Sequence, residues 1–358
     1  MDNFEPVTEE CIQLLQELIS IPSFSKKEEE TATAISKFLI KKEIDFERFG
    51  NNIIAYAKSF DATKPTVWLN SHHDTVKPNK AYTRDPFSPD IEDGKLFGLG
   101  SNDAGGPLVS LLGAFLILKD KELPFNLIFI ASAEEEISGK KGISLVLEHL
   151  TEPELVIVGE PTQMKMALAE KGLMVLDCEV IGKPGHAARN EGINAIYLAL
   201  EDLEKVKNFE FKKVSPYLGK SKVTATIIQA GSQHNVVPDL CTFTLDVRVT
   251  DVYTLEEALE ELQNSLSAKL VPRSLRLRSS KTPEDHPIIR ASAKCGMETF
   301  GSPTLSDQAL IPYPSVKIGP GDSARSHSAD EFIYISEIEK AVVDYVVLLE
   351  KYAQIKSE

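Results

Sequence analysis

The sequence predicts an α/β protein of two domains, with the smaller domain inserted into the larger. The chain has 358 residues, which is more than one hydrophobic core usually organises. Near both ends, short and almost wholly apolar runs alternate with helical patterns, which is typical of a central sheet buried on both faces. Between these parts the expected order changes to β-α-β-β-α-β, as in a ferredoxin-like unit. We therefore expect a larger domain over 1–169 and 281–358 and an inserted domain over 170–280.

The larger domain is expected to begin with two amphipathic helices. Apolar residues recur at helical spacing from Cys11 to Ile19, with Thr8 as the N-cap, and Ile35 and Leu39 share a face of the second helix with Phe38. The other elements expected in this domain are strands at 53–57, 67–70, 126–131, 155–158 and 315–318, and helices at 107–118, 288–300 and 336–352.

The inserted domain is expected to contain two helices and four strands. The helices are predicted at 194–206 and 255–270, and the strands at 173–181, 222–229, 242–249 and 274–278.

Composition excludes several classes of partner. Lys and Arg total 39 against 54 Asp and Glu, a net charge of −15, and a surface this acidic repels the phosphates of nucleic acids. No stretch approaches the roughly 20 apolar residues of a membrane span, and the start MDNFEPVTEE lacks the layout of a signal peptide. The cysteines are scattered without a CxxC pair, so we expect buried, reduced thiols and a cytoplasmic protein.

The run WLNSHHDTV places His72, His73 and Asp74 at the end of an apolar strand. In α/β proteins this end of a strand faces the binding crevice. A histidine that binds a metal needs an acceptor for its second ring nitrogen, and Asp74 is suited to orient His72. An H-x-D triplet is more often structural when it stands alone.

The segment GLGSNDAGGP carries Asp103 just before an apolar helix. Its opening resembles a dinucleotide fingerprint, but the sixth position is Asp103 and a carboxylate there would repel a pyrophosphate. Glycines that permit close backbone approach suit an acid that must reach a cation. A helix N-cap is the alternative role of Asp103.

Three consecutive acids, Glu134, Glu135 and Glu136, follow the apolar strand LIFIA. Adjacent carboxylates raise each other's pKa unless a cation neutralises them, and an acid with a raised pKa is suited to act as a general base. A metal ligand beside a catalytic base explains the triplet. Placement on the surface by chance is the alternative.

Two further residues complete the pattern. Glu160 follows the apolar strand LVIV directly, and His327 lies in the glycine-rich loop of VKIGPGDSARSHSADEF. Mixed nitrogen and oxygen ligands suit zinc, and five such groups hold two cations if one carboxylate bridges them. A shared water between two such ions is acidified, which predicts a hydrolase. The predicted ligand set is His72, Asp103, Glu136, Glu160 and His327.

The motifs SHHDTV, GLGSNDAGGP, AEEEISG, VGEPT and SHSADEF, in this order, resemble the M20 metallopeptidase family. This family includes acetylornithine deacetylase, succinyl-diaminopimelate desuccinylase, aminoacylase and the carboxypeptidase G2 type. The resemblance runs from the first helix to the last. It implies a zinc-exopeptidase-like catalytic domain with a mixed central sheet, and an inserted domain that serves for dimerisation and as a lid.

The resemblance also implies individual roles. His72 and Glu160 would bind one zinc, Glu136 and His327 the other, and Asp103 would bridge, with cobalt as a substitute metal. Glu135 would be the general base and Asp74 would orient His72. The register of the acid triplet rests on ADEE-type segments in relatives, with Glu134 in the place of their Asp.

In the inserted domain, GKPGHAA resembles the segment whose histidine reaches the partner subunit's active site and stabilises the oxyanion, which implies this role for His186 and a homodimer. Taken alone, it is a histidine in a turn. Asn235 and Arg248 match positions that contact substrate in relatives, and an Arg fork suits a carboxylate. A structural salt bridge is the alternative role of Arg248.

Among the activities of the family, this short chain most resembles the acetylornithine deacetylase group of arginine biosynthesis, which releases acetate and a free amino acid. Succinyl-diaminopimelate desuccinylase, deacylases of acetyl-citrulline, acetyl-lysine, succinyl-ornithine or succinyl-citrulline, and M20 dipeptidase are the alternatives. A catalytically inactive metal-binding module is a different class of answer, which missing ligands would favour, and all five predicted ligands are present.

Overall fold

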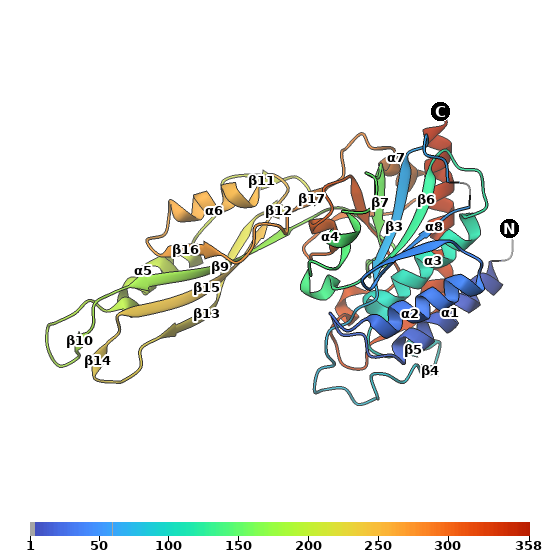
Figure 1. The fold of residues 1–358 in the computed structure, drawn as a ribbon. Helices are drawn as coiled ribbons and strands as arrows, with labels where there is room; N and C mark the ends of the chain where they lie inside the picture. The colour runs from blue at the N-terminus through green and yellow to red at the C-terminus, as the bar shows by residue number, and fades with distance from the viewer. Residues whose placement is uncertain (1–3, 59) are drawn as a thin grey trace. The chain divides into compact units, whose positions relative to one another are not determined.

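The chain divides into two compact units in the computed structural model, which describes residues 4–58 and 60–358. Unit 1 contains the residues up to Leu168 together with Lys281–Phe300 and Ser306–Glu358. Unit 2 contains Ala169–Ser280 and the short segment Gly301–Leu305 (Figure 1).

Unit 1 is built on a mixed sheet in the strand order β1-β2-β6-β3-β7-β19-β8-β17, and β18 also pairs with β8. Strands β6, β3, β7 and β19 run parallel to one another, and β1, β2 and β8 pair antiparallel with their neighbours. This mixed central sheet confirms the predicted fold class. The strands are β1 (Phe46–Phe49), β2 (Asn52–Tyr56), β3 (Thr66–His72), β6 (Asn126–Ser132), β7 (Leu155–Val158), β8 (Met166–Glu170), β17 (Ser280–Lys281), β18 (Thr299–Ser302) and β19 (Ser315–Lys317).

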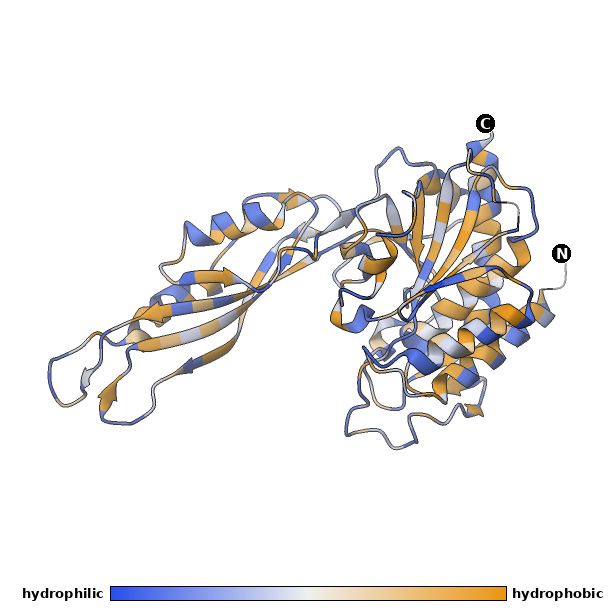
Figure 2. Ribbon diagram, viewed as in Figure 1, coloured by the Kyte–Doolittle hydropathy of each residue, from blue (hydrophilic) through white to orange (hydrophobic). Residues whose placement is uncertain are grey.

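Both faces of the central strands are buried, as their apolar sequences predict. On one face, Trp68 packs with α4 (Ile143–Val146). On the other, Phe129 meets Phe115 of α3 (Gly106–Leu118) with ring centroids 6.1 Å apart. Figure 2 shows the apolar colour along these strands and α3. Since side chains alternate along a strand, Asn70 and His72 share the face of Trp68.

Helices cover this sheet, and α3 is the most deeply buried of them. A Cβ atom at Gly113 would lie 2.9 Å from the Val342 side chain, so this glycine allows α3 and α8 to pack closely. By length and composition Ser101–Leu118 is apolar enough to span a membrane, but 83% of it is buried inside the fold, so core packing accounts for its composition. The other helices of unit 1 are α1 (Glu5–Ile19), α2 (Glu29–Lys41), α7 (Pro287–Lys294) and α8 (Ile335–Lys356).

Unit 1 also contains a small antiparallel sheet in the strand order β20-β5-β4. Its strands are β4 (Ile91–Glu92), β5 (Lys95–Phe97) and β20 (Phe332–Tyr334). Strand β20 directly follows the loop that carries His327, so this sheet fixes the end of that loop.

Unit 2 has the ferredoxin-like order of elements, with a four-stranded antiparallel sheet in the order β13-β15-β9-β16. Buried and half-buried residues alternate along β9, as expected when helices cover one face only. The main elements are β9 (Gly172–Ile181), α5 (Ala195–Lys207), β13 (Lys222–Ala230), β15 (Leu240–Val249), α6 (Leu255–Gln263) and β16 (Lys269–Pro272). Two short ladders join β10 (Gly185–His186) to β14 (Val236–Val237) and β11 (Val214–Ser215) to β12 (Gly219–Lys220).

Three predicted boundaries are wrong. Helix α1 begins at Glu5, and the Thr8 hydroxyl donates to the Phe4 carbonyl inside the first turn instead of capping the helix. Helix α6 ends at Gln263, because Lys269–Pro272 pairs with β9; this pairing replaces the strand predicted at 274–278. Helix α7 ends at Lys294, because Gly296 adopts a positive φ of 68° and Thr299–Ser302 joins the sheet.

The cysteines are free thiols, as predicted. Burial is the main reason that the pKa of the Cys11 thiol rises to about 12, so this thiol is an inert part of the core. Cys295 is half-buried rather than buried, because it follows the last turn of α7. The full set is Cys11, Cys178, Cys241 and Cys295.

Candidate metal centre

The candidate site lies at the carboxyl ends of the four parallel strands of unit 1. His72 is the last residue of β3, the acid triplet follows β6, and Glu160 follows β7. The loop after β19 carries His327. Because parallel strands end at the same edge of a sheet, residues far apart in the sequence meet here.

Asp103 reaches this edge from a turn, Ser101–Gly105, that precedes α3. Its backbone (φ −121°, ψ 96°) is not helical, and the Asp103–Ala104 peptide is cis. The residue at the N-cap of α3 is Gly105. Asp103 is therefore not a helix cap, and its carboxylate is directed toward the histidines.

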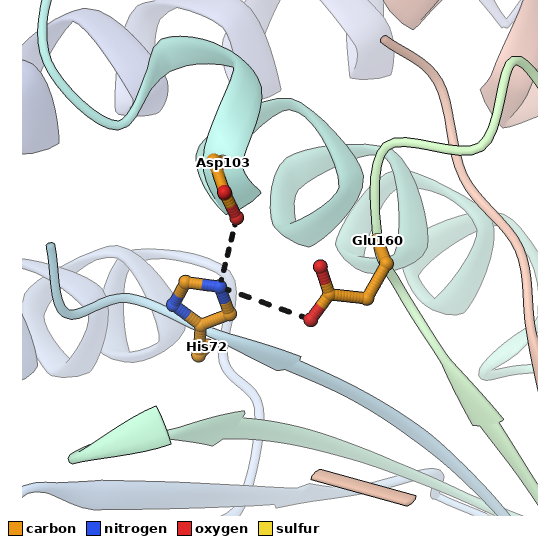
Figure 3. A group of neighbouring side chains, drawn as sticks. All are labelled: His72, Asp103 and Glu160. Carbon is orange, nitrogen blue, oxygen red and sulfur yellow. Dashed lines mark hydrogen bonds and ion pairs between the residues drawn. The ribbon is translucent and has the colours of Figure 1, made fainter. Parts of the chain in front are cut away.

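The first group of neighbouring donors consists of His72, Asp103 and Glu160. The Nε2 atom of His72 lies 3.3 Å from Asp103 Oδ1 and 3.9 Å from Glu160 Oε1 (Figure 3). The Nδ1 atom lies 3.0 Å from the Asp74 carbonyl oxygen and 3.5 Å from its carboxylate. The Asp74 backbone is thus the closer partner of this ring nitrogen, although sequence reasoning assigned that contact to the side chain.

The second group consists of Asp103, Glu136 and His327. The Nε2 atom of His327 lies 3.1 Å from Glu136 Oε2 and 3.7 Å from Asp103 Oδ2. Asp103 therefore belongs to both groups, with Oδ1 toward one imidazole and Oδ2 toward the other.

Glu135 belongs to neither group of donors but lies beside the first. Its Oε2 atom is 3.9 Å from His72 Nε2. The N–H groups of Glu135 and Glu136 donate to Asp74 Oδ1 and Oδ2 at 2.9 and 3.2 Å, and the Ser25 hydroxyl donates to Oδ2 at 2.7 Å. The Asp74 carboxylate thus fixes the backbone of the acid triplet.

Glu134 is turned away from both groups. It is buried, its backbone has a positive φ of 52°, and its Oε2 atom accepts a hydrogen bond from the Lys141 N–H at 3.2 Å. Its carbonyl accepts the Gly139 N–H at 2.7 Å. This residue shapes the turn that presents the two acids after it.

Electrostatics within the cluster are strongly perturbed. Burial raises the pKa of Glu135 well above its usual value, and Glu160 and Asp307 raise it further against the opposing effect of His72. Burial likewise raises the pKa of Glu160 to about 8. The hydrogen bond to Glu136 raises the pKa of His327 to about 9.

His72 and Asp103 are shifted by each other. Burial alone would lower the pKa of His72, but Asp103, Asp74 and the neighbouring glutamates together raise it well above its usual value. Burial would raise the pKa of Asp103, but His72 and His327 hold it below its usual value.

The donor set fits divalent cations. Several carboxylates share a small, largely buried volume, where each like-charged neighbour raises the free energy of the ionised state. Within each group the potential ligand atoms all lie within 4.8 Å of one another. Oxygen and imidazole ligands at this spacing suit zinc or a similar metal ion, which would neutralise the repulsion.

The predicted residues of unit 2 separate into two places. His186 lies in β10, which pairs with β14, and the Asn235 carbonyl accepts the Ala187 N–H at 3.0 Å, so His186 and Asn235 are neighbours. Arg248 is paired with Leu173 near the other end of the sheet. Its guanidinium forms a two-point ion pair with Asp246, at 2.8 and 3.0 Å.

Sequence reasoning missed two buried acids of unit 1. Asp307 Oδ2 accepts hydrogen bonds from Asn70 Nδ2 at 2.9 Å and Ser132 Oγ at 2.7 Å, so it joins the ends of β3 and β6, and burial raises its pKa to about 6. Burial and then Asp103 raise the pKa of Glu331 to about 8. Both acids have polar neighbours in the sequence, in LSDQAL and ADEFIY, so no local apolar pattern marked them as buried.

The family model for peptidase family M20/M25/M40 matches residues 68–351. The chain belongs to this family. The resemblance of the motifs is thereby confirmed, and this M20 protein is a hydrolase that cleaves amide bonds.

Two curated relatives of this M20 hydrolase differ in the substrate that their names give. A putative LysW-lysine/LysW-ornithine hydrolase from Pyrobaculum aerophilum is 29% identical over 92% of this chain and 94% of its own length. An acetylornithine deacetylase from Buchnera aphidicola subsp. Schizaphis graminum is 26% identical, over 78% of this chain and 79% of its own length.

Solved structures share the fold of this M20 hydrolase. Aminopeptidase PepT from Bacillus cereus has a TM-score of 0.78 at 20% identity and covers 97% of this chain and 99% of its own. The YxeP protein from Bacillus subtilis, described as a dinuclear metal binding peptidase from the M20 family, has a TM-score of 0.76 at 18% identity, over 99% and 100%.

The raised pKa values predict how a metal ion stabilises the protein. Without metal, folded Glu160 and His327 bind protons more tightly than the unfolded chain, so their contribution to stability is lost as pH rises through about 8 to 9. A bound cation replaces those protons. We expect the difference in Tm between metal-loaded and chelator-treated protein to grow between about pH 6 and about pH 9. Differential scanning fluorimetry measures this difference.

The control is Glu160→Gln, which removes the carboxyl group with a pKa of about 8. Its chelator-treated form should lose less stability over the same interval than the wild type. A metal-dependent Tm difference that stays constant with pH would contradict the electrostatic account.

Proposed function

We propose that this M20 hydrolase uses two zinc ions to remove the acyl group from a small N-acylated amino acid, with acetylornithine deacetylase-like activity as its specific reaction. The main support for this proposal is the position of Asp103, whose two carboxylate oxygens face the imidazoles of two separate donor groups. An acid in this position is suited to bridge two cations, a recurrent arrangement in hydrolytic sites.

In this proposal His72 and Glu160 hold one zinc, Glu136 and His327 hold the other, and Asp103 is shared, with cobalt as an alternative metal. The ions would polarise the amide carbonyl and acidify the attacking water. The Asp74 carbonyl accepts the Nδ1 proton of His72, which leaves Nε2 as the ligand atom.

Glu135 is the proposed general base, which takes a proton from the attacking water and delivers it to the leaving amine. Its burial beside Glu160 and Asp307 raises its pKa, so its carboxylate is a stronger base than an exposed glutamate. Asp74 is the proposed positioning residue for this base, because it holds the Glu135 N–H at 2.9 Å.

We propose that the enzyme is a homodimer joined through unit 2. Strand β13 is an edge strand of its sheet, and nearly all of its residues are exposed, including Ile228 at 53%. On the adjacent helix α5, Tyr197 is 68% and Leu200 is 53% exposed. Unpaired edges and contiguous apolar side chains are typical of surfaces that a second copy covers.

The placement of the substrate-binding candidates supports a role in trans. His186 and Asn235 lie beyond the end of the sheet where Ile181 pairs with Leu240. Arg248 is eight residues further along β15 than Leu240, which is roughly 26 Å at about 3.3 Å per residue. One small substrate does not span that distance. If both sets contact it, they come from different subunits.

The names of the relatives support the substrate class. Ornithine is common to the relatives named for acetylornithine and for LysW-ornithine, and lysine occurs in the second name. We therefore propose a substrate whose amino acid is basic. We also propose a cytoplasmic location, because the four cysteines are free thiols rather than disulfides.

A substrate panel tests the specific reaction. It comprises acetyl-ornithine, acetyl-lysine, acetyl-citrulline, succinyl-ornithine, succinyl-citrulline, succinyl-diaminopimelate, a dipeptide and a LysW-linked lysine, each assayed with zinc or cobalt. We expect the highest kcat/KM for acetyl-ornithine, because ornithine is common to the names of both kinds of relative. A clear preference for another compound of the panel would replace acetyl-ornithine as the proposed substrate. Inactivity of the metal-loaded protein on every compound would contradict the proposal.

Substitutions in the acid triplet test which acid is the general base and which is the metal ligand. We expect Glu135→Gln to keep its metal and lose roughly a hundredfold or more in kcat, because the proton acceptor is gone. Glu136→Ala should lose metal as well as activity. Metal content by plasma mass spectrometry and steady-state kinetics measure the two effects.

Glu134→Gln is the matched control, because Glu134 faces the Lys141 N–H rather than either donor group. It should retain both metal and most of the activity. The assignment fails if Glu134→Gln loses metal, which would move the register by one residue.

Mixing two inactive variants tests the dimer. In a heterodimer of His186→Ala with Glu135→Gln, one site combines an intact Glu135 with the partner's intact His186. If His186 acts in trans, random subunit exchange restores about a quarter of the wild-type activity. If it acts in cis, activity stays at the level of the separate variants. Sedimentation velocity on the wild type and on Tyr197→Asp checks that the assembly depends on the α5 surface.

A further inference from the structure

Glu331 is a buried carboxylate that belongs to neither group of proposed metal ligands. Its side chain is 2% exposed. Its two oxygens accept three backbone N–H groups, all at 2.9 Å: Gly100 on Oε2, and Asn102 and Asp103 on Oε1. These donors lie in one short segment, Gly98–Gly105, which we call the Asp103 loop.

Glu331 also belongs to the segment Gly319–Glu331, which carries His327 and which we call the His327 loop. The carbonyl of Glu331 accepts the Gly98 N–H at 2.9 Å, so both its backbone and its side chain contact the Asp103 loop. Glu331 therefore joins two segments. The Asp103 loop presents the proposed ligand shared by both metals, and the His327 loop presents a proposed ligand of the second metal.

Side chains of the two loops continue this contact. Asn102 Oδ1 accepts the Asp322 N–H at 3.0 Å, and Asn102 Nδ2 donates to the Asp322 carbonyl at 3.1 Å. A side-chain hydrogen bond from Ser326 reaches Asp103. The loops are thus held together along their length, with the Glu331 side chain as the buried hydrogen-bond acceptor among these contacts.

The His327 loop contains an uncommon backbone conformation. His327 has φ 56°, which few residues with a side chain adopt. Asp103 departs from helical geometry immediately before α3. Backbone of this kind persists where surrounding contacts fix it, and N–H bonds to a buried carboxylate are among the stronger contacts that do so.

We propose that Glu331 is a positioning residue that sets the metal affinity of the centre: by binding the N–H groups of Gly100, Asn102 and Asp103, it holds the Asp103 carboxylate between His72 and His327. This inference rests on the proposed function, in which these residues bind zinc. Glu331 does not itself touch the metal. It acts through the backbone of the shared ligand.

Substitution by glutamine tests the contact with little change in shape. In Glu331→Gln the amide oxygen still accepts N–H groups, but the amide NH₂ faces a backbone donor and leaves it unpaired. We expect zinc affinity, measured by competition with a chromogenic chelator, to fall by roughly 10- to 100-fold, as is typical when a group that orients a ligand is lost. Because Asp103 is shared, both zinc ions should be affected.

Hydrogen exchange provides a readout without metal. In chelator-treated protein, the amides of the Asp103 loop should exchange faster in Glu331→Gln than in the wild type, because their acceptor is weakened. Mass spectrometry of peptides covering 98–105 measures this, and peptides from α8 report whether the whole unit has been destabilised instead.

Asp330→Asn is the matched control. Asp330 adjoins Glu331 and also accepts several hydrogen bonds, from the N–H groups of Thr83 and Arg84 and from the Thr83 hydroxyl, but it is half-buried and its partners lie outside the Asp103 loop. Asparagine tolerates its positive φ of 52°. This variant should keep wild-type zinc affinity and wild-type exchange at 98–105.

The outcomes separate this inference from the proposed function. If wild-type protein binds no zinc, the proposed function fails. If wild type binds zinc and Glu331→Gln binds it equally well, or is less stable with unchanged affinity, Glu331 is only a structural residue and the inference is overturned. Should Glu331→Gln not fold, Glu331→Asp keeps the carboxyl group but reaches fewer donors, and unchanged affinity and exchange in that variant overturn the inference equally.

Discussion

Repulsion between buried carboxylates is the constraint on which the rest of the structure depends. Two unit charges 4 Å apart interact by about 4 kcal/mol at an effective dielectric of 20. At the edge of the unit 1 sheet, a carboxylate oxygen of Asp103 lies within 4.8 Å of one on Glu160, and another such pair joins Asp103 to Glu136. Imidazoles and backbone N–H groups face these carboxylates and reduce the cost of the repulsion. The geometry of the cluster also suits divalent cations, which would reduce it further.

Acids of the same chemical type therefore serve different purposes according to what faces them. Asp103 faces two histidines, whereas Asp74 faces the N–H groups of the acid triplet. Asp307 faces neutral side chains of Asn70 and Ser132, and Glu331 faces the backbone of the Asp103 loop. The acids that bind backbone or neutral groups give the centre its shape, and the acids directed toward histidines give it its proposed chemistry.

The residues proposed to bind substrate belong to unit 2, whereas the proposed metal ligands belong to unit 1. The unit 2 sheet keeps His186 and Asn235 at one end and Arg248 at the other, and no strand among the described residues pairs with the outer edge of β13. A compact metal centre at strand ends is common to hydrolases with many substrates, because it contacts only the bond that is cleaved. Selectivity for the acyl group and the amino acid has to arise from residues that approach from elsewhere.

The sequence by itself determined the fold class, the order of elements in both units and the neighbourhood of the proposed ligands. These follow from local properties: apolar runs mark buried strands, and polar residues directly after such runs mark strand ends. Tertiary structure decided what local patterns do not contain. It ended α6 and α7 early, because later residues pair with strands far away in the chain, and it placed Arg248 against Asp246. It also brought Glu331 to the Asp103 loop across more than two hundred residues, because a contact of that range depends on how the sheet orders its strands rather than on the residues beside it.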